Sequence, residues 1–153
     1  MKKNIIAAIA VIGAVLVLAA AAFVLLNDDG DRNSLDELPD GLRETDVEVN
    51  AGGRWELPGK ITTNAETRND AAAVIVQGSG PSDMDGTYGK TYVYRDLAWG
   101  LAQYDIDVLR YDKRTYVYGA ASADNIAKIT VMEETINDAI AAAELLRDLG
   151  YER

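Results

Sequence analysis

Apolar residues recur along the second half of the chain with spacings that predict a strand, a helix, a second strand and a final helix. The first strand is the apolar run Ala71–Val76, which we expect to be buried and which ends in the glycine-rich segment Gln77–Pro81. A helix is predicted over Tyr92–Gln103 and the next strand over Ile106–Tyr111. This alternation favours parallel pairing of the two strands through a helical crossover.

The two predicted helices each carry an apolar face. In the first helix this face contains Leu97, Ala98 and Leu101. The last helix has the best start signal, because Thr130 followed by Glu133 forms a capping box. Gly150 can end this helix. Its expected buried stripe consists of Ile136, Ile140, Ala143, Leu146 and Leu149.

An antiparallel pair of strands is predicted ahead of this alternation. Val47–Val49 alternates apolar and acidic residues, and Trp55–Thr62 can form the second strand. Pro58 lacks a backbone N–H, so its presence argues for an edge strand or a bulge there.

The N-terminal segment Ile5–Leu26 contains 22 residues without a charge and follows Lys2 and Lys3. As a helix it would span roughly 33 Å, enough for a hydrocarbon core of about 30 Å. The lysines then place the domain outside the cytoplasm, as a single-pass cell-membrane protein. The alternative is a cleaved signal peptide and a secreted or periplasmic domain. We therefore divide the chain into an anchor or signal (1–26), an acidic flexible linker (27–43) and a folded domain (44–153).

Composition excludes several classes of function. The formal net charge is −10, which makes nucleic acid an improbable partner. The chain has no Cys and no His, so it cannot assemble a cysteine nucleophile, a histidine metal site or a Ser-His-acid triad. We expect no metal and no cofactor. Gly78 and Gly80 match two glycines of a dinucleotide fingerprint, but Asp83 replaces the third. The acidic turn Asp83–Gly86 has its glycine too early for an EF-hand.

Several segments, taken in their order along the chain, resemble the first half of a bacterial serine hydrolase of the α/β-hydrolase family. The segments are Ala71–Pro81, Arg95–Ala102, Val108–Thr115 and Glu133–Ala139. The resemblance is to the dienelactone-hydrolase and acyl-peptidase branches of that family. It implies an α/β class of fold, here the N-terminal strands of a mostly parallel sheet with flanking helices. The activity it implies is hydrolysis of an ester, thioester or peptide bond through an acyl-serine.

The resemblance also assigns a role to the glycine-rich loop. In this family the loop after the first buried strand supplies one oxyanion-hole N–H, which falls on Ser79 or Gly80 within the loop residues Gln77, Gly78, Ser79 and Gly80. The family places His where this chain has Gln77, which leaves the side-chain support of the loop open.

A nucleophile elbow needs glycine two residues before and two residues after the serine. None of the four serines has that spacing: Ser34, Ser79, Ser82 and Ser122. We therefore expect no catalytic residue in this chain, and a stop before the strand that carries the nucleophile.

Asp112, Lys113 and Arg114 follow the second buried strand and are candidates for a charged rim around an acyl or peptide substrate. The alternative is that Asp112 fixes the loop while Lys113 and Arg114 are solvated.

Three hypotheses on function follow. The chain is part of a serine hydrolase and needs a C-terminal half, or it is a non-catalytic, membrane-tethered binding module of the cell envelope, or it is a truncated product without a role of its own.

Overall fold

The computed structural model describes residues 36–52, 55–78, 80–119 and 130–152, all but the first four of which belong to the compact unit Asp40–Arg153. The predicted anchor or signal lies outside the described residues, as does most of the predicted linker. Among the helices that the structure describes between residues 36 and 152, none combines the length and the apolar content needed to cross a bilayer.

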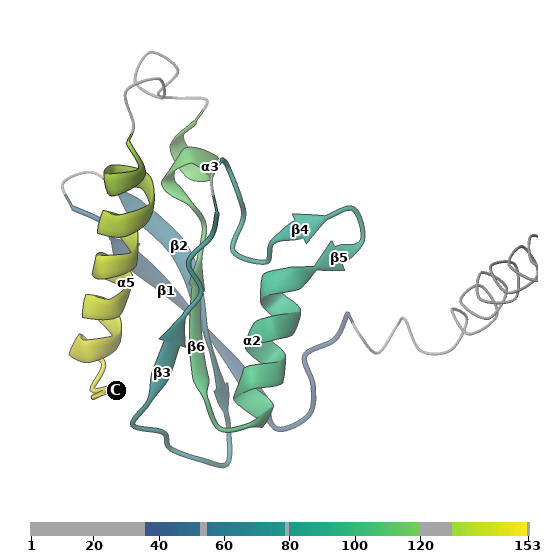
Figure 1. The fold of residues 1–153 in the computed structure, drawn as a ribbon. Helices are drawn as coiled ribbons and strands as arrows, with labels where there is room; N and C mark the ends of the chain where they lie inside the picture. The colour runs from purple at the N-terminus through teal and green to yellow at the C-terminus, as the bar shows by residue number, and fades with distance from the viewer. Residues whose placement is uncertain (1–35, 53–54, 79, 120–129, 153) are drawn as a thin grey trace, which may run out of the picture. The chain divides into compact units, whose positions relative to one another are not determined.

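Four strands form one mixed sheet in the order β1-β2-β6-β3 (Figure 1). The predicted N-terminal hairpin is confirmed as β1 (Leu42–Asn50) and β2 (Glu56–Asn64), and β1 begins two residues inside the predicted linker. β2 pairs antiparallel with β6 (Asp107–Tyr111), which pairs parallel with β3 (Ala72–Val74). The predicted parallel crossover is therefore present, but a mostly parallel sheet is wrong for the described strands, because two of the three pairings are antiparallel.

Two expectations about single strands are also corrected. β2 is an internal strand with no bulge in its register, so Pro58 does not mark an edge. The Pro58 carbonyl accepts the N–H of Asp112 at 2.7 Å, directly after the last paired residue of β6, where a missing N–H costs little. β3 is an edge strand among the described residues, and its residues are half-exposed rather than buried.

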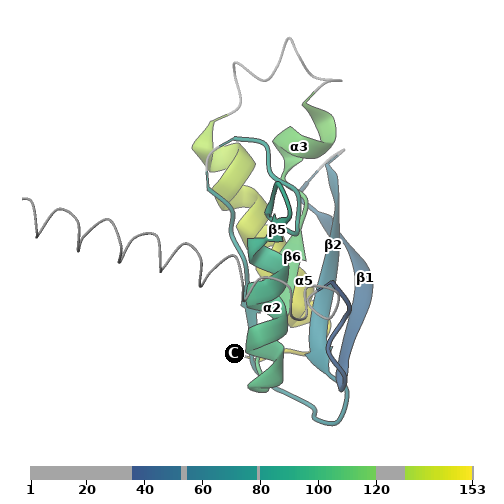
Figure 2. The ribbon, with the colours of Figure 1, turned by 90° about the vertical axis from the view of Figure 1, so that its right-hand side faces the viewer.

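The sheet lies between two helices. Side chains alternate along β6, so Leu109 and Tyr111 face one side and Val108 faces the other. α2 (Val93–Gln103) covers the Val108 side, and α5 (Asn137–Asp148) covers the Leu109 side (Figure 2).

Helix positions are predicted better than helix faces. The capping box is present, because Thr130 N–H donates to Glu133 Oε2 at 3.0 Å and Glu133 N–H donates to Thr130 Oγ1 at 3.3 Å. The first turn is a π-helical segment, η1 (Met132–Ile136), which continues directly into α5. The expected stripe on α5 is largely wrong, since Ile140 is exposed whereas Asp138 is buried.

The exposed members of the expected α5 stripe also include Ile136, Ala143 and Leu149, and the buried positions are Asp138, Ala142 and Leu146. In α2 the buried positions are Ala98, Trp99 and Ala102, while Leu97 is exposed.

Three short elements were not predicted. β4 (Thr87–Tyr88) and β5 (Thr91–Tyr92) form a small hairpin ahead of α2, and α3 (Arg114–Tyr118) follows β6. All three lie at the end of the molecule to which the carboxyl ends of β3 and β6 point (Figure 1). The sheet therefore positions its loops and short helices at one edge.

Candidate functional site

The candidate site is the loop of residues 77–86 together with residues 112–114. The two segments follow β3 and β6, which run parallel, so they leave the sheet at the same edge. Open α/β sheets bind their ligands outside the carboxyl ends of such strands. Lys113 N–H donates to the carbonyl of Ser82 at 3.1 Å, which joins the two segments through the backbone. The two segments therefore lie side by side.

Gln77 anchors the start of the loop with its side chain, which is buried. Its amide Nε2 donates to the carbonyl of Tyr111 at the end of β6 and to the carbonyl of Asp83 at 3.3 Å. The side-chain support that the sequence left open is therefore supplied by Gln77 itself. Both amide hydrogens have acceptors, so this side chain holds the start of the loop against the end of β6.

The glycines of the loop differ in what they require. Gly80 has φ of +90°, a conformation that favours glycine over other residues. The carbonyl of Gly78 accepts a hydrogen bond from Lys113 Nζ. Ser79 lies outside the described residues, and an oxyanion role for the backbone of Ser79 or Gly80 stays a prediction.

Asp112 holds the far end of the loop. Its Oδ1 accepts the backbone N–H of Met84 at 2.6 Å, which confirms the sequence interpretation that Asp112 fixes the loop. Burial raises the pKa of Asp112, the Met84 bond lowers it, and the negative charges of Asp83 and Asp85 raise it, with a net upward direction.

Lys113 and Arg114 are buried, so the expectation that they are solvated is wrong. Lys113 Nζ pairs with Glu134 at 3.3 Å, and Arg114 forms a bidentate pair with Asp138. Each cation enters the interior because a carboxylate from the η1–α5 region meets it there. Their part in binding a substrate, and that of Asp112, stays a prediction.

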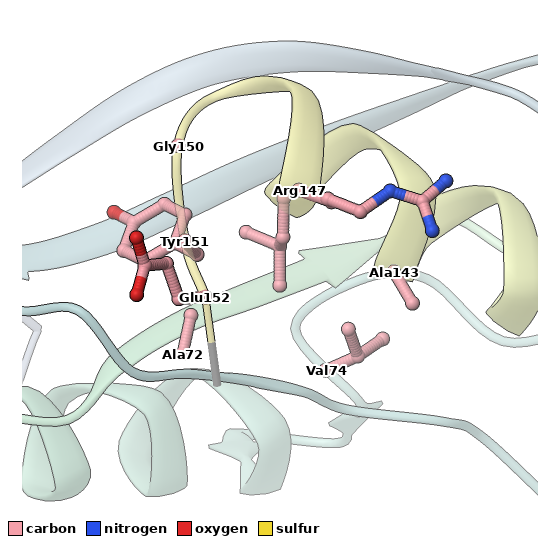
Figure 3. Close-up of a pocket in the computed structure, with 8 residues that line it drawn as sticks. Ala72, Val74, Ala143, Arg147, Gly150, Tyr151 and Glu152 are labelled. Carbon is pink, nitrogen blue, oxygen red and sulfur yellow. The ribbon is translucent and has the colours of Figure 1, made fainter.

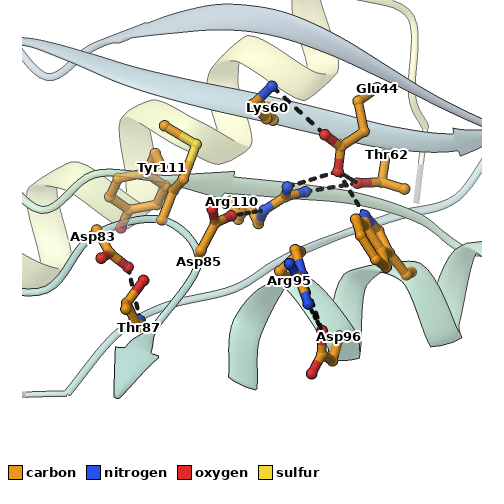
Figure 4. Close-up of polar contacts among 12 residues, drawn as sticks. Glu44, Lys60, Thr62, Asp83, Asp85, Thr87, Arg95, Asp96, Arg110 and Tyr111 are labelled. Carbon is orange, nitrogen blue, oxygen red and sulfur yellow. Dashed lines mark hydrogen bonds and ion pairs between the residues drawn. The ribbon is translucent and has the colours of Figure 1, made fainter. Parts of the chain in front are cut away.

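Arg110 is a buried residue of the site region that the sequence reasoning missed. Its guanidinium contacts Glu44 at 2.6 Å, Thr62 at 2.7 Å and Asp85 at 3.0 Å (Figure 4). Asp85 in turn accepts the N–H groups of Tyr94 and Arg95 through its carbonyl. The sequence feature that could have revealed it is an arginine within the apolar run of β6, because a buried arginine requires an anionic partner. Arg110 thus connects the loop to the centre of the sheet.

Glu44 is the main anionic partner in this network. It also accepts the indole N–H of Trp99 at 2.7 Å and lies 3.6 Å from Lys60 Nζ (Figure 4). Burial alone would raise the pKa of Glu44, but the hydrogen bonds from Trp99 and Arg110 and the charges of Arg110 and Lys60 together lower it. The carboxylate is therefore held in its ionised form.

The arrangement supplies an ordered loop at one edge of the sheet, held by side chains and backbone groups of both segments. Ser82 Oγ donates to the carbonyl of Asp83 at 3.2 Å, and the other three serines lie outside the described residues. Within the parts of the chain that the structure describes, no group of three or more acidic residues could hold a metal ion. What the site offers chemically is a set of backbone groups held in place by Gln77, Asp112 and Lys113.

The chain is similar to a known esterase, which supports an esterase-type hydrolase. The chain is 40% identical to Esterase EstD of Thermotoga maritima over 110 residues. The match covers 72% of this chain but 24% of the esterase, so the chain spans about a quarter of the relative's length. No family model matches the chain.

Proposed function

We propose that this chain is the N-terminal portion of an α/β-hydrolase-type serine hydrolase that cleaves an ester, thioester or peptide bond. The observation that carries the proposal is the 40% identity to an esterase over 72% of the chain. The sheet order and the braced loop at the carboxyl edge of β3 and β6 fit this function, because such a loop presents backbone N–H groups to a developing oxyanion. The nucleophile, the acid and the histidine are supplied by further chain.

The open edge of β3 supports the need for further chain. No strand pairs with its outer side within the described residues. A groove of about 630 Å³ runs beside it, with Ala72 and Val74 on one wall and Ala143 and Arg147 of α5 on the other (Figure 3). Glu152 N–H already donates to the carbonyl of Asp70 at 3.0 Å, directly before β3. A segment that continues from Glu152 and pairs with β3 would therefore run parallel to it.

The location that we propose is extracytoplasmic, with a membrane anchor at residues 5–26. The support is the uncharged segment and the two lysines that precede it. Protease treatment of intact spheroplasts should degrade the domain while the protein fractionates with membranes. Recovery of a soluble form that begins near Phe23 would establish the cleaved-signal alternative instead.

A non-catalytic binding module is the second candidate function. It is favoured by the hydrogen bonding of the interior, as expected of a chain that is stable by itself. Thr115 Oγ1 is the one buried side-chain polar atom without a hydrogen-bond partner among the described residues. This alternative predicts that the chain is monomeric and stable as it is.

A chimera tests the hydrolase proposal. The matched segment of Esterase EstD is replaced by the corresponding residues of this chain, and turnover of a short-chain p-nitrophenyl ester is measured. We expect the chimera to hydrolyse the ester and to react with a fluorophosphonate probe, while this chain alone does neither. A folded chimera without turnover would contradict the hydrolase proposal. Stoichiometric labelling of a serine in this chain alone by the fluorophosphonate probe would contradict the claim that the nucleophile lies outside it.

A further inference from the structure

We propose that Lys113 is a positioning residue for the loop after β3, because its ammonium group fixes the orientation of the Gly78 peptide. The contact of Lys113 Nζ with the Gly78 carbonyl is given by the structure. Its consequence for catalysis rests on the proposed function, whereas the effect on the loop does not.

Lys113 contacts both ends of the short glycine segment. Its backbone N–H donates to the carbonyl of Ser82 at 3.1 Å, and its side chain donates to the carbonyl of Gly78. Gln77 and Asp112 hold the loop outside this segment, through Tyr111 and Met84 respectively. Lys113 therefore holds the segment between Gly78 and Ser82 at both ends, outside the contacts of Gln77 and Asp112.

The direction of one carbonyl determines the direction of the next amide. A trans peptide is planar, so the N–H that follows a carbonyl points away from it. The contact with buried Lys113 holds the Gly78 carbonyl towards the protein interior. Glycine has no side chain to restrict its rotation, so without this contact the peptide can turn over at low cost.

The position of the ammonium group is itself fixed. The Lys113 side chain is 1% exposed, and its Nζ lies 3.3 Å from Glu134 Oε1, whose side chain is 13% exposed. Burial of an ammonium is unfavourable without an anionic partner, which Glu134 provides. A charge-assisted hydrogen bond to a carbonyl is stronger than a neutral one, so a buried lysine holds the carbonyl more firmly than a neutral donor would. The pair also links the loop to the beginning of the last helix.

The first test needs no activity. Hydrogen exchange by mass spectrometry is followed on the full chain in mild detergent for the wild type, Lys113→Met and Lys113→Arg. We expect faster exchange in peptides that cover residues 77–84 in Lys113→Met and near-normal exchange in Lys113→Arg. The matched control is Lys60→Met, which removes the same charge from a lysine whose partners are Asp46 and Glu44. Unchanged exchange at residues 77–84 in a folded Lys113→Met variant would overturn the proposal.

The second test uses the chimera with Esterase EstD. Lys113→Met should lower kcat by about tenfold or more while KM changes by about twofold at most, because a misplaced oxyanion donor affects the transition state and not substrate binding. Lys113→Arg should recover most of kcat. A purely structural role would lower the amount of folded protein and leave kcat per folded molecule unchanged. If the unsubstituted chimera is inactive, the proposed function fails, and the exchange experiment still decides the role of Lys113.

Discussion

The buried pair of Arg114 and Asp138 is expected to control the stability of the domain. The two side chains are 6% and 0% exposed, and Arg114 Nε lies 3.0 Å from each carboxylate oxygen. The perturbation removes one partner at a time, with Asp138→Asn or Arg114→Met. A third variant, Arg114→Met with Asp138→Leu, removes both charges.

The expected losses follow from the burial of the charges. Removal of one partner of a buried pair leaves the other charge without compensation and costs about 3–5 kcal/mol. The total free energy of unfolding of a domain is about 5–15 kcal/mol, so either single variant removes a large share of it. Arg114→Met also loses the contacts of the guanidinium with the carbonyl of Ala51 at 3.3 Å and with the Trp55 ring at 5.2 Å. The double variant should be close to neutral, because no unpaired charge remains.

The two single variants should differ in their pH dependence. Burial raises the pKa of Asp138, and the hydrogen bond and charge of Arg114 lower it, with a net upward direction. In Arg114→Met the lowering contribution is lost and the pKa of Asp138 rises further. A folded-state pKa above the unfolded value means that stability is present below the unfolded pKa, about 3.9, and is lost as the pH rises through the folded pKa. The stability of the Asp138→Asn variant has no such contribution to its pH dependence, since asparagine does not titrate.

Urea unfolding of the full chain in mild detergent measures these effects. Trp55 packs on Tyr118 and Trp99 donates to Glu44, so tryptophan fluorescence reports both sides of the sheet. The four proteins are compared at about pH 5 and about pH 8, because a raised pKa moves the loss of the Asp138 proton to higher pH. A loss below about 1 kcal/mol for both single variants would refute the reasoning, since it would mean that the pair is solvated. An equal cost of Arg114→Met at both pH values would refute the part that concerns Asp138.

Three further predictions follow from other parts of the structure. Gly86→Ala should cost about 1–3 kcal/mol in thermal unfolding, because the new Cβ would lie 2.5 Å from Tyr94 Cδ2 at a φ of +64°. Gly41→Ala, at a φ of +82° with no atom within 4 Å, should cost only the backbone strain. Because the pKa of Glu44 is lowered in the folded state, the ionised carboxylate stabilises the fold above the unfolded pKa of glutamate. This stability should be lost on acidification through the folded-state pKa of Glu44, and Glu44→Gln should abolish that pH dependence. Because the outer edge of β3 has no partner among the described residues, the chain should self-associate in sedimentation velocity or bind a hydrophobic dye, and a monomer with a sharp two-state melt would favour the binding module.

The sequence predicted the elements whose signals are local. The strand run before Gln77, the helix α2, the strand β6 and the capping box of the last helix all depend on residues close together in the chain, and all are present. The hairpin β4–β5 and α3 are too short to carry a periodic signal.

The partners of the interior charges were not predictable from local pattern. Arg110, Lys113 and Arg114 are buried because each meets a carboxylate that is distant in sequence, such as Glu44 for Arg110 and Asp138 for Arg114. The same reason explains the wrong face on α5. Asp138 faces the interior because it pairs with the buried Arg114, and the apolar Ile140 is then exposed.

Pro58 has a consequence for the uniqueness of strand pairing. In the observed register its missing N–H falls at the last rung between β2 and β6, opposite Asp112. A shift of β6 by two residues would keep every side chain on its face but would set Pro58 opposite Arg110 or beyond the ladder. In the first case the carbonyl of Arg110 would lose its donor in the interior, at a cost of about 1–3 kcal/mol. One imino acid thus discriminates against a slipped sheet, and it ends the ladder where Asp112 and Lys113 must leave it to hold the loop.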